Sequence, residues 1–270
     1  MGVGEAVSTE HGTPVRRAVL SGLCLVLILT GCAASEDPGE PRPREWDAAV
    51  VATYPHDPDA FTQGLEIHDG QLYEATGLYG KSWIATSDIR TGTVSRRVEL
   101  PDTWFGEGLT LTGAGIWQVT WRNHIAVLRD RTSLKVRRQV RYDGEGWGIC
   151  HQASTDRLVM SDGSAELTFR DPATFSAKDS VTVTLAGRAQ DRLNELECVG
   201  GYVWANVFER HHIVRIDLDT GRVTDVVHVP ERHSEGVLNG IAALPGTDDL
   251  LVTGKNWPSL YRITPRARAR

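Results

Sequence analysis

The sequence is short of lysine, of net positive charge and of nucleophile motifs, and the last two shortages each exclude a class of protein. Only four of its 29 basic residues are lysines, and the net charge is −6 with a pI near 5.9. A nucleic-acid partner is therefore not expected, because phosphate binding needs a basic face. The nine histidines show no His-Glu-x-x-His spacing of a zinc hydrolase. No serine or cysteine lies in a recognisable nucleophile context.

The chain also lacks an apolar run long enough to cross a membrane as a helix. Its longest run, 18–29, follows Arg16 and Arg17 and falls short of the roughly 18 residues of a spanning helix. These features predict a secretory signal peptide over residues 1–31. The run ends in Leu-Thr-Gly-Cys, which resembles the lipobox of bacterial lipoproteins. The resemblance implies a lipid on Cys32 that anchors an exported protein to the extracytoplasmic side of a membrane, at the cell surface or in a periplasm. An ordinary secreted protein is the alternative.

Composition predicts the remaining domain boundaries. Residues 36–44 are charged and rich in proline, with too few apolar groups to fold, so residues 32–45 are expected to be a semi-rigid tether. A folded domain is expected over 46–265, followed by a solvated basic tail at 266–270. With 40% hydrophobic and 24% charged residues, the chain has an ordinary globular composition.

A short motif recurs five times in the folded part. Its central residue varies and is in turn Gln63, Glu107, Trp147, Asn194 and Asn239, at steps of 44, 40, 47 and 45 residues. An aliphatic residue follows two places later in every copy, at Leu65, Leu109, Ile149, Leu196 and Ile241. A scaffold that repeats its apolar positions and varies one other position arranges different side chains around a common point.

The stretches between the motif copies read as β-strands. Two of them in each unit alternate between apolar and other residues, and turns rich in Gly, Asp and Thr bound them. A further alternating stretch follows each of the first four units, at 93–100, 134–142, 180–185 and 222–229. Four-stranded units of about 40–50 residues are typical of propeller blades. Residues 46–54 can supply the strand missing from the fifth unit and so remove two exposed edges. We predict an all-β fold, a five-bladed β-propeller whose last blade is closed by the N-terminal strand.

Two cysteines remain once the signal and the lipid site are set aside, Cys150 and Cys198. Export permits a disulfide between them, but sequence alone cannot show that their Cα atoms are close enough. Because they follow different repeats, we expect two buried free thiols.

The innermost strands of a propeller line its central channel, so the five central residues should meet near one mouth of it. The predicted pocket combines the polar residues Gln63, Glu107, Asn194, Asn239 and Lys255 with the aromatic residues Phe61, Phe105, Trp121, Trp147, Phe208 and Trp257. A concave, aromatic-walled site with a few convergent polar groups is the usual form of a small-molecule pocket. A single carboxylate in such surroundings is poorly solvated, which favours its protonated form and suits Glu107 to proton transfer.

The motifs around these residues resemble those of the plant-type (papaya-type) glutaminyl-peptide cyclotransferases, five-bladed propellers with bacterial relatives. The matching stretches are 61–65, 77–82, 105–108, 145–148, 161–164, 193–197, 203–206, 238–241 and 253–258. The resemblance implies conversion of an N-terminal glutaminyl residue into pyroglutamyl with release of ammonia. It implies that Glu107 is the acid/base and that Lys255 and Asn194 donate to the carbonyl oxygen.

The same resemblance assigns the rest of the pocket. It implies that Gln63 is a polar site residue, and it assigns the walls to Phe61, Phe105, Trp121 and Trp147. Phe208 stands where the family's tryptophan is expected, a departure that bears on substrate preference and not on reaction type. The implied partners are peptides or proteins with an N-terminal glutamine, and the protein is expected to be a monomer.

No metal is needed for this chemistry, so no catalytic cofactor is expected, although a structural Ca²⁺ deeper in the channel stays open. One alternative is a metal-dependent, lactonase-like hydrolase, with Ca²⁺ held by Glu107, Asn194, Asn239 and Asp162. One carboxylate among the central residues is few for such a site. The other alternative is a non-enzymatic propeller that binds peptides or glycans at the surface, which has no need of a lone carboxylate.

Overall fold

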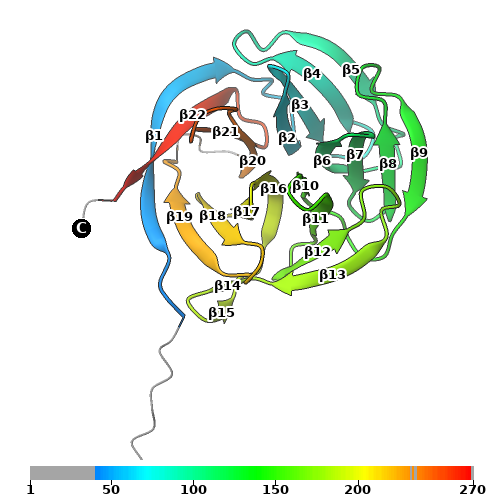
Figure 1. The fold of residues 1–270 in the computed structure, drawn as a ribbon. Helices are drawn as coiled ribbons and strands as arrows, with labels where there is room; N and C mark the ends of the chain where they lie inside the picture. The colour runs from blue at the N-terminus through cyan, green and yellow to red at the C-terminus, as the bar shows by residue number, and fades with distance from the viewer. Residues whose placement is uncertain (1–39, 232, 234–235, 269–270) are drawn as a thin grey trace, which may run out of the picture. The chain divides into compact units, whose positions relative to one another are not determined.

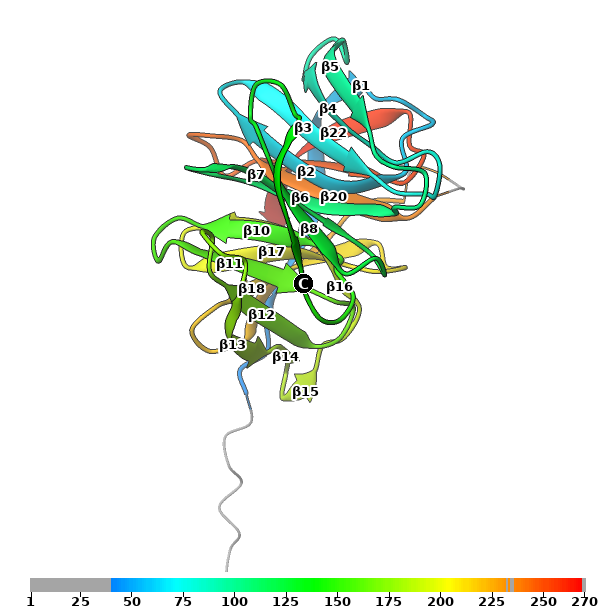
Figure 2. The ribbon, with the colours of Figure 1, turned by 90° about the vertical axis from the view of Figure 1, so that its right-hand side faces the viewer.

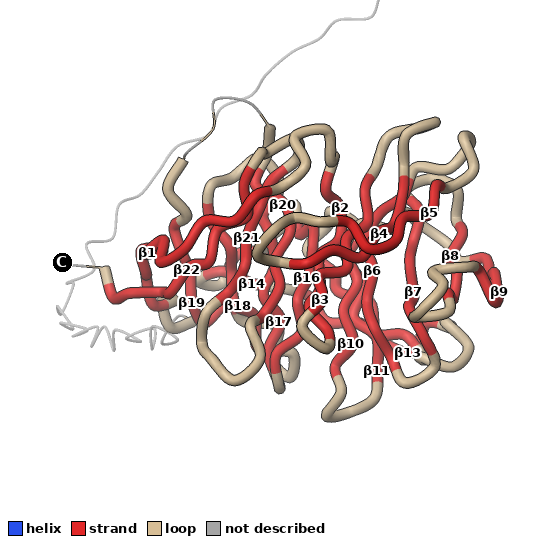
Figure 3. Tube along the Cα trace, turned by 90° about the horizontal axis from the view of Figure 1, so that it is seen from above, coloured by secondary structure: helices blue, strands red, loops and turns tan. Residues whose placement is uncertain are grey.

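The computed structural model describes residues 40–231, 233 and 236–268, which belong to one compact unit, Pro38–Arg270. Every regular element in these ranges is a β-strand (Figure 3), so the predicted all-β class is confirmed. None of the described residues forms a helix that could cross a membrane. The predicted signal peptide and the predicted lipid site at Cys32 lie outside the described residues.

Three four-stranded antiparallel sheets follow one another around a common centre (Figure 1). The first contains β2 (Thr62–His68), β3 (Gln71–Thr76), β4 (Trp83–Asp88) and β5 (Val94–Glu99). The second contains β6 (Gly106–Thr112), β7 (Gly115–Thr120), β8 (Ile125–Arg129) and β9 (Val136–Arg141). The third contains β10 (Ile149–Gln152), β11 (Arg157–Ser161), β12 (Glu166–Arg170) and β13 (Ala177–Thr182). In each sheet the first strand lies nearest the centre.

The outer strand of the third sheet begins and ends three residues earlier than the sequence predicted, at Ala177–Thr182 in place of 180–185. The alternation misled the prediction because it continues past the strand end, through buried Val183 and partly buried Leu185, which pack on the same core cluster. Leu185 belongs instead to a short ribbon of β14 (Thr184–Leu185) and β15 (Arg188–Ala189) that projects beside β13 (Figure 2).

The remaining strands form one eight-stranded sheet with the order β16-β17-β18-β19-β1-β22-β21-β20. Its strands are β16 (Leu193–Val199), β17 (Tyr202–Val207), β18 (His212–Asp217), β19 (Val223–His228), β20 (Leu238–Ala243), β21 (Leu250–Gly254), β22 (Ser259–Ala267) and β1 (Arg44–Pro55). As predicted, the first strand pairs antiparallel with the last, β22. The sequence did not predict that β1 also pairs parallel with β19, which joins two neighbouring meanders.

Pairing with β1 also moves the predicted domain boundaries. Strand β22 continues to Ala267, and Arg266 pairs there with Asp47. The first two residues of the predicted solvated tail therefore belong to the sheet. At the other end, strand β1 already includes Arg44. Glu40, within the predicted tether, accepts a hydrogen bond from the main-chain N–H of Gly187 at 2.6 Å. Polar contacts thus hold Glu40 against the β14–β15 ribbon.

Close approach of the inner strands explains why glycine follows the central residue in four of the five motif copies. A Cβ atom at Gly148 would lie 2.1 Å from the carbonyl oxygen of Asn194. In the fourth copy Glu195 occupies this position and is buried. Its carboxylate accepts hydrogen bonds from the main-chain N–H groups of Leu65 at 3.2 Å and Ile241 at 2.8 Å. One carboxylate thus ties three inner strands together.

Two further acids in the channel act in the same way. Glu66 accepts a hydrogen bond from the N–H of Leu111 at 3.0 Å, and Glu197 accepts one from Ala243 at 2.8 Å. Burial raises the pKa of Glu66 to about 7 and raises the pKa of Glu197 well above its usual value. No group of three or more His, Cys, Asp or Glu side chains within the described ranges is arranged to hold a metal ion.

The expectation of two free thiols is wrong, because Cys150 and Cys198 form a disulfide with their Cα atoms 5.4 Å apart. Cys150 lies on β10 and Cys198 on β16. These are the innermost strands of consecutive sheets, which converge toward the centre (Figure 1). Residues 48 apart in the chain are therefore neighbours in space, although they follow different repeats.

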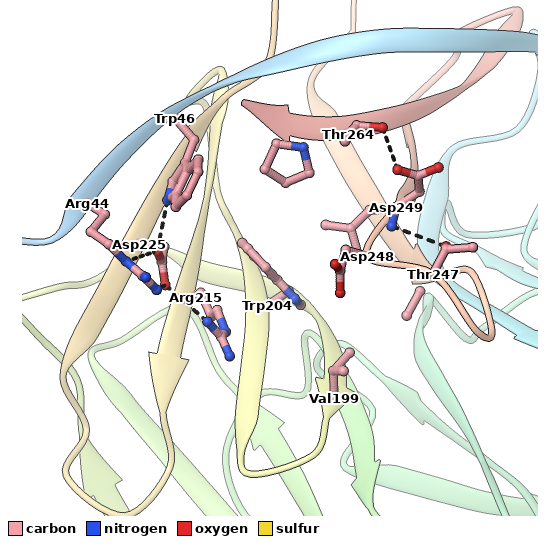
Figure 4. Close-up of a pocket in the computed structure, with 13 residues that line it drawn as sticks. Arg44, Trp46, Val199, Trp204, Arg215, Asp225, Thr247, Asp248, Asp249 and Thr264 are labelled. Atoms are coloured by element: carbon pink, nitrogen blue, oxygen red, sulfur yellow. Dashed lines mark hydrogen bonds and ion pairs between the residues drawn. The ribbon is translucent and has the colours of Figure 1, made fainter. Parts of the chain in front are cut away.

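A second polar cluster holds β1 against β19, its parallel neighbour in the eight-stranded sheet (Figure 4). Asp225 on β19 accepts hydrogen bonds from Trp46 Nε1 at 2.8 Å and Arg44 Nη2 at 3.0 Å, and Arg215 lies 3.3 Å away. These side chains border a hollow of about 450 Å³, called the junction groove below. The groove is lined by Arg44, Trp46, Val199, Trp204, Arg215, Asp225, Ala243, Thr247, Asp248, Asp249, Leu250, Thr264 and Pro265.

Candidate active site

Four of the five central residues lie at the same place in their inner strands, one residue after the strand begins. These residues are Gln63 on β2, Glu107 on β6, Asn194 on β16 and Asn239 on β20. The fifth, Trp147, comes just before β10. A cavity of about 410 Å³, called the central pocket below, opens at this end of the strands. It is lined by Phe61, Gln63, Leu78, Phe105, Glu107, Trp121, Trp147, Asn194, Phe208 and Lys255.

Nine of the eleven predicted pocket residues line this cavity, and Asn239 and Trp257 do not. Trp257 is fully buried in the core, with His233 and Tyr261 as ring neighbours. The reason is local: Asn256, with φ of 62°, turns the chain between Lys255 and Trp257. Lys255 therefore faces the pocket while Trp257 packs behind it.

Asn239 lies beneath the central pocket and orients Gln63. Fully buried, it donates hydrogen bonds to the carbonyl oxygen of Thr62 at 2.9 Å and to Gln63 Oε1 at 3.0 Å. With its oxygen so engaged, Gln63 presents Nε2, which donates to Glu107 Oε1 at 2.9 Å. The relay from Asn239 through Gln63 fixes the carboxyl group of Glu107 from one side.

The two ionisable groups of the central pocket are both held away from their ordinary titration range. Burial raises the pKa of Glu107 well above its usual value; the positive charge of Lys255 opposes this shift, and the negative charge of Glu145 adds to it. Burial lowers the pKa of Lys255, and Glu107 opposes that shift. The Lys255 ammonium also lies over the rings of Phe61, at 4.8 Å, and Phe208, at 5.1 Å from their centroids. An acid and an amine with converging pKa values are suited to exchanging protons near neutrality.

Asn194 supplies an unused acceptor at the same place. Its side chain is buried, and its Oδ1 atom has no hydrogen-bond partner in the described part of the chain. Most buried polar atoms in proteins have a partner, so an exception at a pocket wall is a place where a bound molecule can supply a donor.

Aromatic rings form the walls in two contacting groups. Phe105 meets Phe61 edge-on with centroids 6.2 Å apart and lies 5.4 Å from Trp121. Trp147 meets Phe208 edge-on at 5.6 Å. Such rings contribute a large apolar surface with defined orientation. Phe208, where the resemblance led us to expect a tryptophan, is part of the wall.

Sequence reasoning missed two contributors to this site. Leu78 lines the pocket from the loop between β3 and β4, with a φ of 83° that an aliphatic residue seldom adopts. Glu145 stands behind the wall and accepts hydrogen bonds from the indole N–H groups of Trp121 and Trp147. For Glu145 a signal was present: it lies within a motif copy, two residues before the central Trp147.

Fold and site together define a class of protein: a propeller-like all-β scaffold whose central pocket contains one buried carboxyl group, one buried amine and a wall of aromatic rings. This arrangement is suited to proton transfer on a small polar group held out of water.

Comparison with known proteins names the family. A family model described as glutamine cyclotransferase matches residues 23–264. The glutaminyl-peptide cyclotransferase of Arabidopsis thaliana is 40% identical over 227 residues, covering 79% of this chain and 70% of that protein. The crystal structure of Myxococcus xanthus glutaminyl cyclase is similar with a TM-score of 0.78 and 32% identity, covering 84% of this chain and 100% of that one. The chain belongs to the glutamine cyclotransferase family, which confirms the predicted resemblance and favours neither the hydrolase nor the binder.

Proposed function

We propose that the chain converts the N-terminal glutaminyl residue of a peptide into a pyroglutamyl residue and releases ammonia. The observation that carries this proposal is the buried carboxyl group of Glu107 in a pocket of about 410 Å³. Gln63 donates a hydrogen bond to it, and the charge of Lys255 acts against the rise in its pKa. The names of the Arabidopsis and Myxococcus relatives support the same reaction.

In this reaction the α-amine nitrogen attacks the carbon of the substrate's own γ-carboxamide. A C–N bond forms to close the five-membered ring, and the bond to the amide nitrogen breaks. Because both groups belong to one flexible residue, holding it folded is a large part of the catalysis. The rings of Phe61, Phe105, Trp121 and Trp147 enclose the volume in which that folded residue fits.

Glu107 moves the proton. As a carboxylate it accepts a proton from the attacking amine, and as an acid it returns that proton to the departing nitrogen, which leaves as ammonia. Such a shuttle contributes about 10²–10⁴ in rate. The raised pKa of Glu107 makes it a better proton acceptor once ionised and a ready donor afterwards. The reaction leaves the enzyme in its starting protonation state.

Lys255 and Asn194 stabilise the carbonyl oxygen while it gains charge. An ammonium beside that oxygen supplies electrostatic stabilisation, and loss of one such donor costs about 2.7–4 kcal/mol. The side-chain NH₂ of Asn194 donates to the carbonyl oxygen of the substrate. Its Oδ1 atom, which has no partner in the described part of the chain, accepts from an N–H of the substrate and so helps to fix the carboxamide.

The test is ammonia release from a glutaminyl dipeptide, compared with a glutamyl dipeptide of the same sequence. We expect release from the first by the wild type and a loss of at least about 10² in kcat for Glu107→Gln. Activity should survive EDTA, since the scheme requires no metal. Absence of turnover on a range of glutaminyl peptides, or loss of activity in EDTA that added Ca²⁺ restores, would contradict the proposal.

Three finer features belong to this proposal. We count the eight-stranded sheet as two blades that share β1, which makes five blades in all. The enzyme acts as a monomer in this proposal. Any structural Ca²⁺ in the channel would have to compete with main-chain N–H groups for Glu66, Glu195 and Glu197. Sedimentation analysis and metal analysis of the purified protein test the last two.

The proposed location is the extracytoplasmic side of a membrane, with a lipid on Cys32. The disulfide between Cys150 and Cys198 supports export, because disulfides persist mainly in oxidising compartments. Mass spectrometry of the mature protein should find a lipidated Cys32 as the first residue. Replacement of Cys32 by serine should move the protein from the membrane fraction to the soluble fraction.

A further inference from the structure

One carboxylate outside the central pocket accepts hydrogen bonds from both tryptophans of the pocket wall. Glu145 Oε2 accepts hydrogen bonds from Trp121 Nε1 at 2.7 Å and from Trp147 Nε1 at 3.0 Å. Its other oxygen accepts from Arg122 Nε at 2.7 Å. The guanidinium of Arg122 in turn lies over the Trp121 ring, 3.8 Å from its centroid. Glu145 therefore joins the loop after β7 to the segment before β10, across two sheets.

Glu145 does not itself line the cavity, and its side chain is 33% exposed. Although burial pushes its pKa upward, the hydrogen bonds from Trp147, Arg122 and Trp121 together hold the pKa below its usual value. At neutral pH it is therefore a carboxylate that accepts two indole N–H groups on one oxygen and Arg122 on the other. An amide oxygen could still accept from the indoles, but the amide NH₂ group could not accept from Arg122.

We propose that Glu145 is a positioning residue that sets the orientation of Trp121 and Trp147 and thereby the folded shape in which a glutaminyl substrate reacts. The inference rests on the proposed function, since it assigns the walls their part in that reaction. An indole is planar, so its N–H direction and one packing contact determine where its face lies. With both N–H groups on one oxygen, the two rings cannot turn independently.

The charge of Glu145 also affects the pH at which Glu107 ionises, a quantity that a loss of stability alone would leave unchanged. The charged and titratable groups that act on Glu107 are Lys255, Glu145 and Tyr142. Lys255 favours ionisation of Glu107, and Glu145 opposes it. Removing the charge of Glu145 should therefore let Glu107 ionise at lower pH, so the acid limb of the kcat/KM profile should move to lower pH.

The experiment compares Glu145→Gln, Glu145→Ala and Glu145→Asp with the wild type on one glutaminyl peptide. Glu145→Ala should lose about 10² in kcat/KM, mostly in kcat, because a displacement of about 1 Å at a positioning group costs this much. Glu145→Gln should show a smaller loss together with the shifted acid limb. Glu145→Asp keeps the charge and should leave the acid limb where it is in the wild type.

Asp225→Asn is the matched control, because Asp225 also accepts from an indole N–H and an arginine but lies at the junction groove. Indole N–H resonances in an NMR spectrum report on the hydrogen bonds to Glu145 and to Asp225. Glu145→Gln should shift two of them, and Asp225→Asn should shift the one of Trp46.

The possible results separate the two ideas. A wild type that releases no ammonia overturns the proposed function and this inference with it. An active wild type whose Glu145→Ala variant keeps its kcat and acid limb overturns the inference alone. Equal losses of kcat in Glu145→Ala and Asp225→Asn, tracking lowered thermal stability in both, also overturn it.

Discussion

The central pocket and the junction groove are built from similar parts and do different things. Their volumes are about 410 and 450 Å³, and each contains a buried carboxyl group, tryptophans and a cation. In the groove, burial pushes the pKa of Asp225 upward, but hydrogen bonds from Arg44, Thr224 and Trp46 lower it overall. In the pocket, Glu107 receives a hydrogen bond from one neutral amide, and burial prevails.

The difference shows what separates a structural acid from a chemical one. A carboxylate whose lone pairs are filled by charged and neutral donors is stable as an anion and holds strands together. When a carboxyl group has few donors in a dry cavity, its ionised and protonated forms have similar free energies near neutral pH. Between these two hollows, the number of donors around the acid explains why Asp225 has a lowered pKa and Glu107 a raised one.

Replacing the acid of each hollow by its amide tests this contrast, and the largest expected effect is in the central pocket. Glu107→Gln should lower kcat by about 10²–10⁴, because the proton shuttle is lost. The thermal midpoint should stay the same or rise, since a neutral amide matches the form of Glu107 that burial favours. Steady-state kinetics and calorimetry measure the two quantities. A large drop in midpoint would show that Glu107 is structural, like Asp225.

In the junction groove, the same replacement of an acid by its amide should lower stability and leave kcat unchanged. Asp225→Asn removes the charge that Arg44 and Arg215 face, and because both arginines stay partly in contact with solvent the loss of stability should be roughly 1–3 kcal/mol. Denaturant unfolding should show this loss of stability, while kcat at a temperature where the variant is folded should be that of the wild type. A selective loss of kcat would contradict the contrast between the two hollows.

Lys255→Met keeps the length of the side chain and removes its charge. We expect kcat/KM to fall by about 10²–10³, the cost of one donor of roughly 2.7–4 kcal/mol. Because Lys255 lowers the pKa of Glu107, its loss should also move the acid limb to higher pH. This direction is opposite to that expected for Glu145→Gln. Acid limbs that move the same way in both variants would refute the charge assignment.

The smallest effect concerns the channel acids and stability. The pKa of Glu66 in the folded protein is about 7, above its value in an unfolded chain. Its contribution to stability is therefore fully present below about pH 4.5 and is lost as the pH rises through about 7. The thermal midpoint of the wild type should fall between pH 5 and 8, and Glu66→Gln should flatten that slope. An unchanged slope would locate the titration elsewhere.

Local pattern was enough for much of the architecture. Alternation with a period of two predicted the strands, and the unfinished fifth unit predicted the pairing of β1 with β22. Where the alternation ran on, as at Val183 and Leu185, the same rule placed a strand three residues late. Most pocket residues were predictable because they lie in the motif copies or in the loops after the second strand of each unit, and these segments meet at one end of the ring.

Sequence by itself determined the all-β class, the repeating unit, the closing strand and the single acid among the central residues, because these depend on neighbours along the chain. Tertiary structure decided the disulfide between Cys150 and Cys198 and the hydrogen bonds that two indole N–H groups donate to Glu145. The physical reason is ring closure: it brings inner strands from different repeats within bonding distance, and those partners are far apart until the ring has formed.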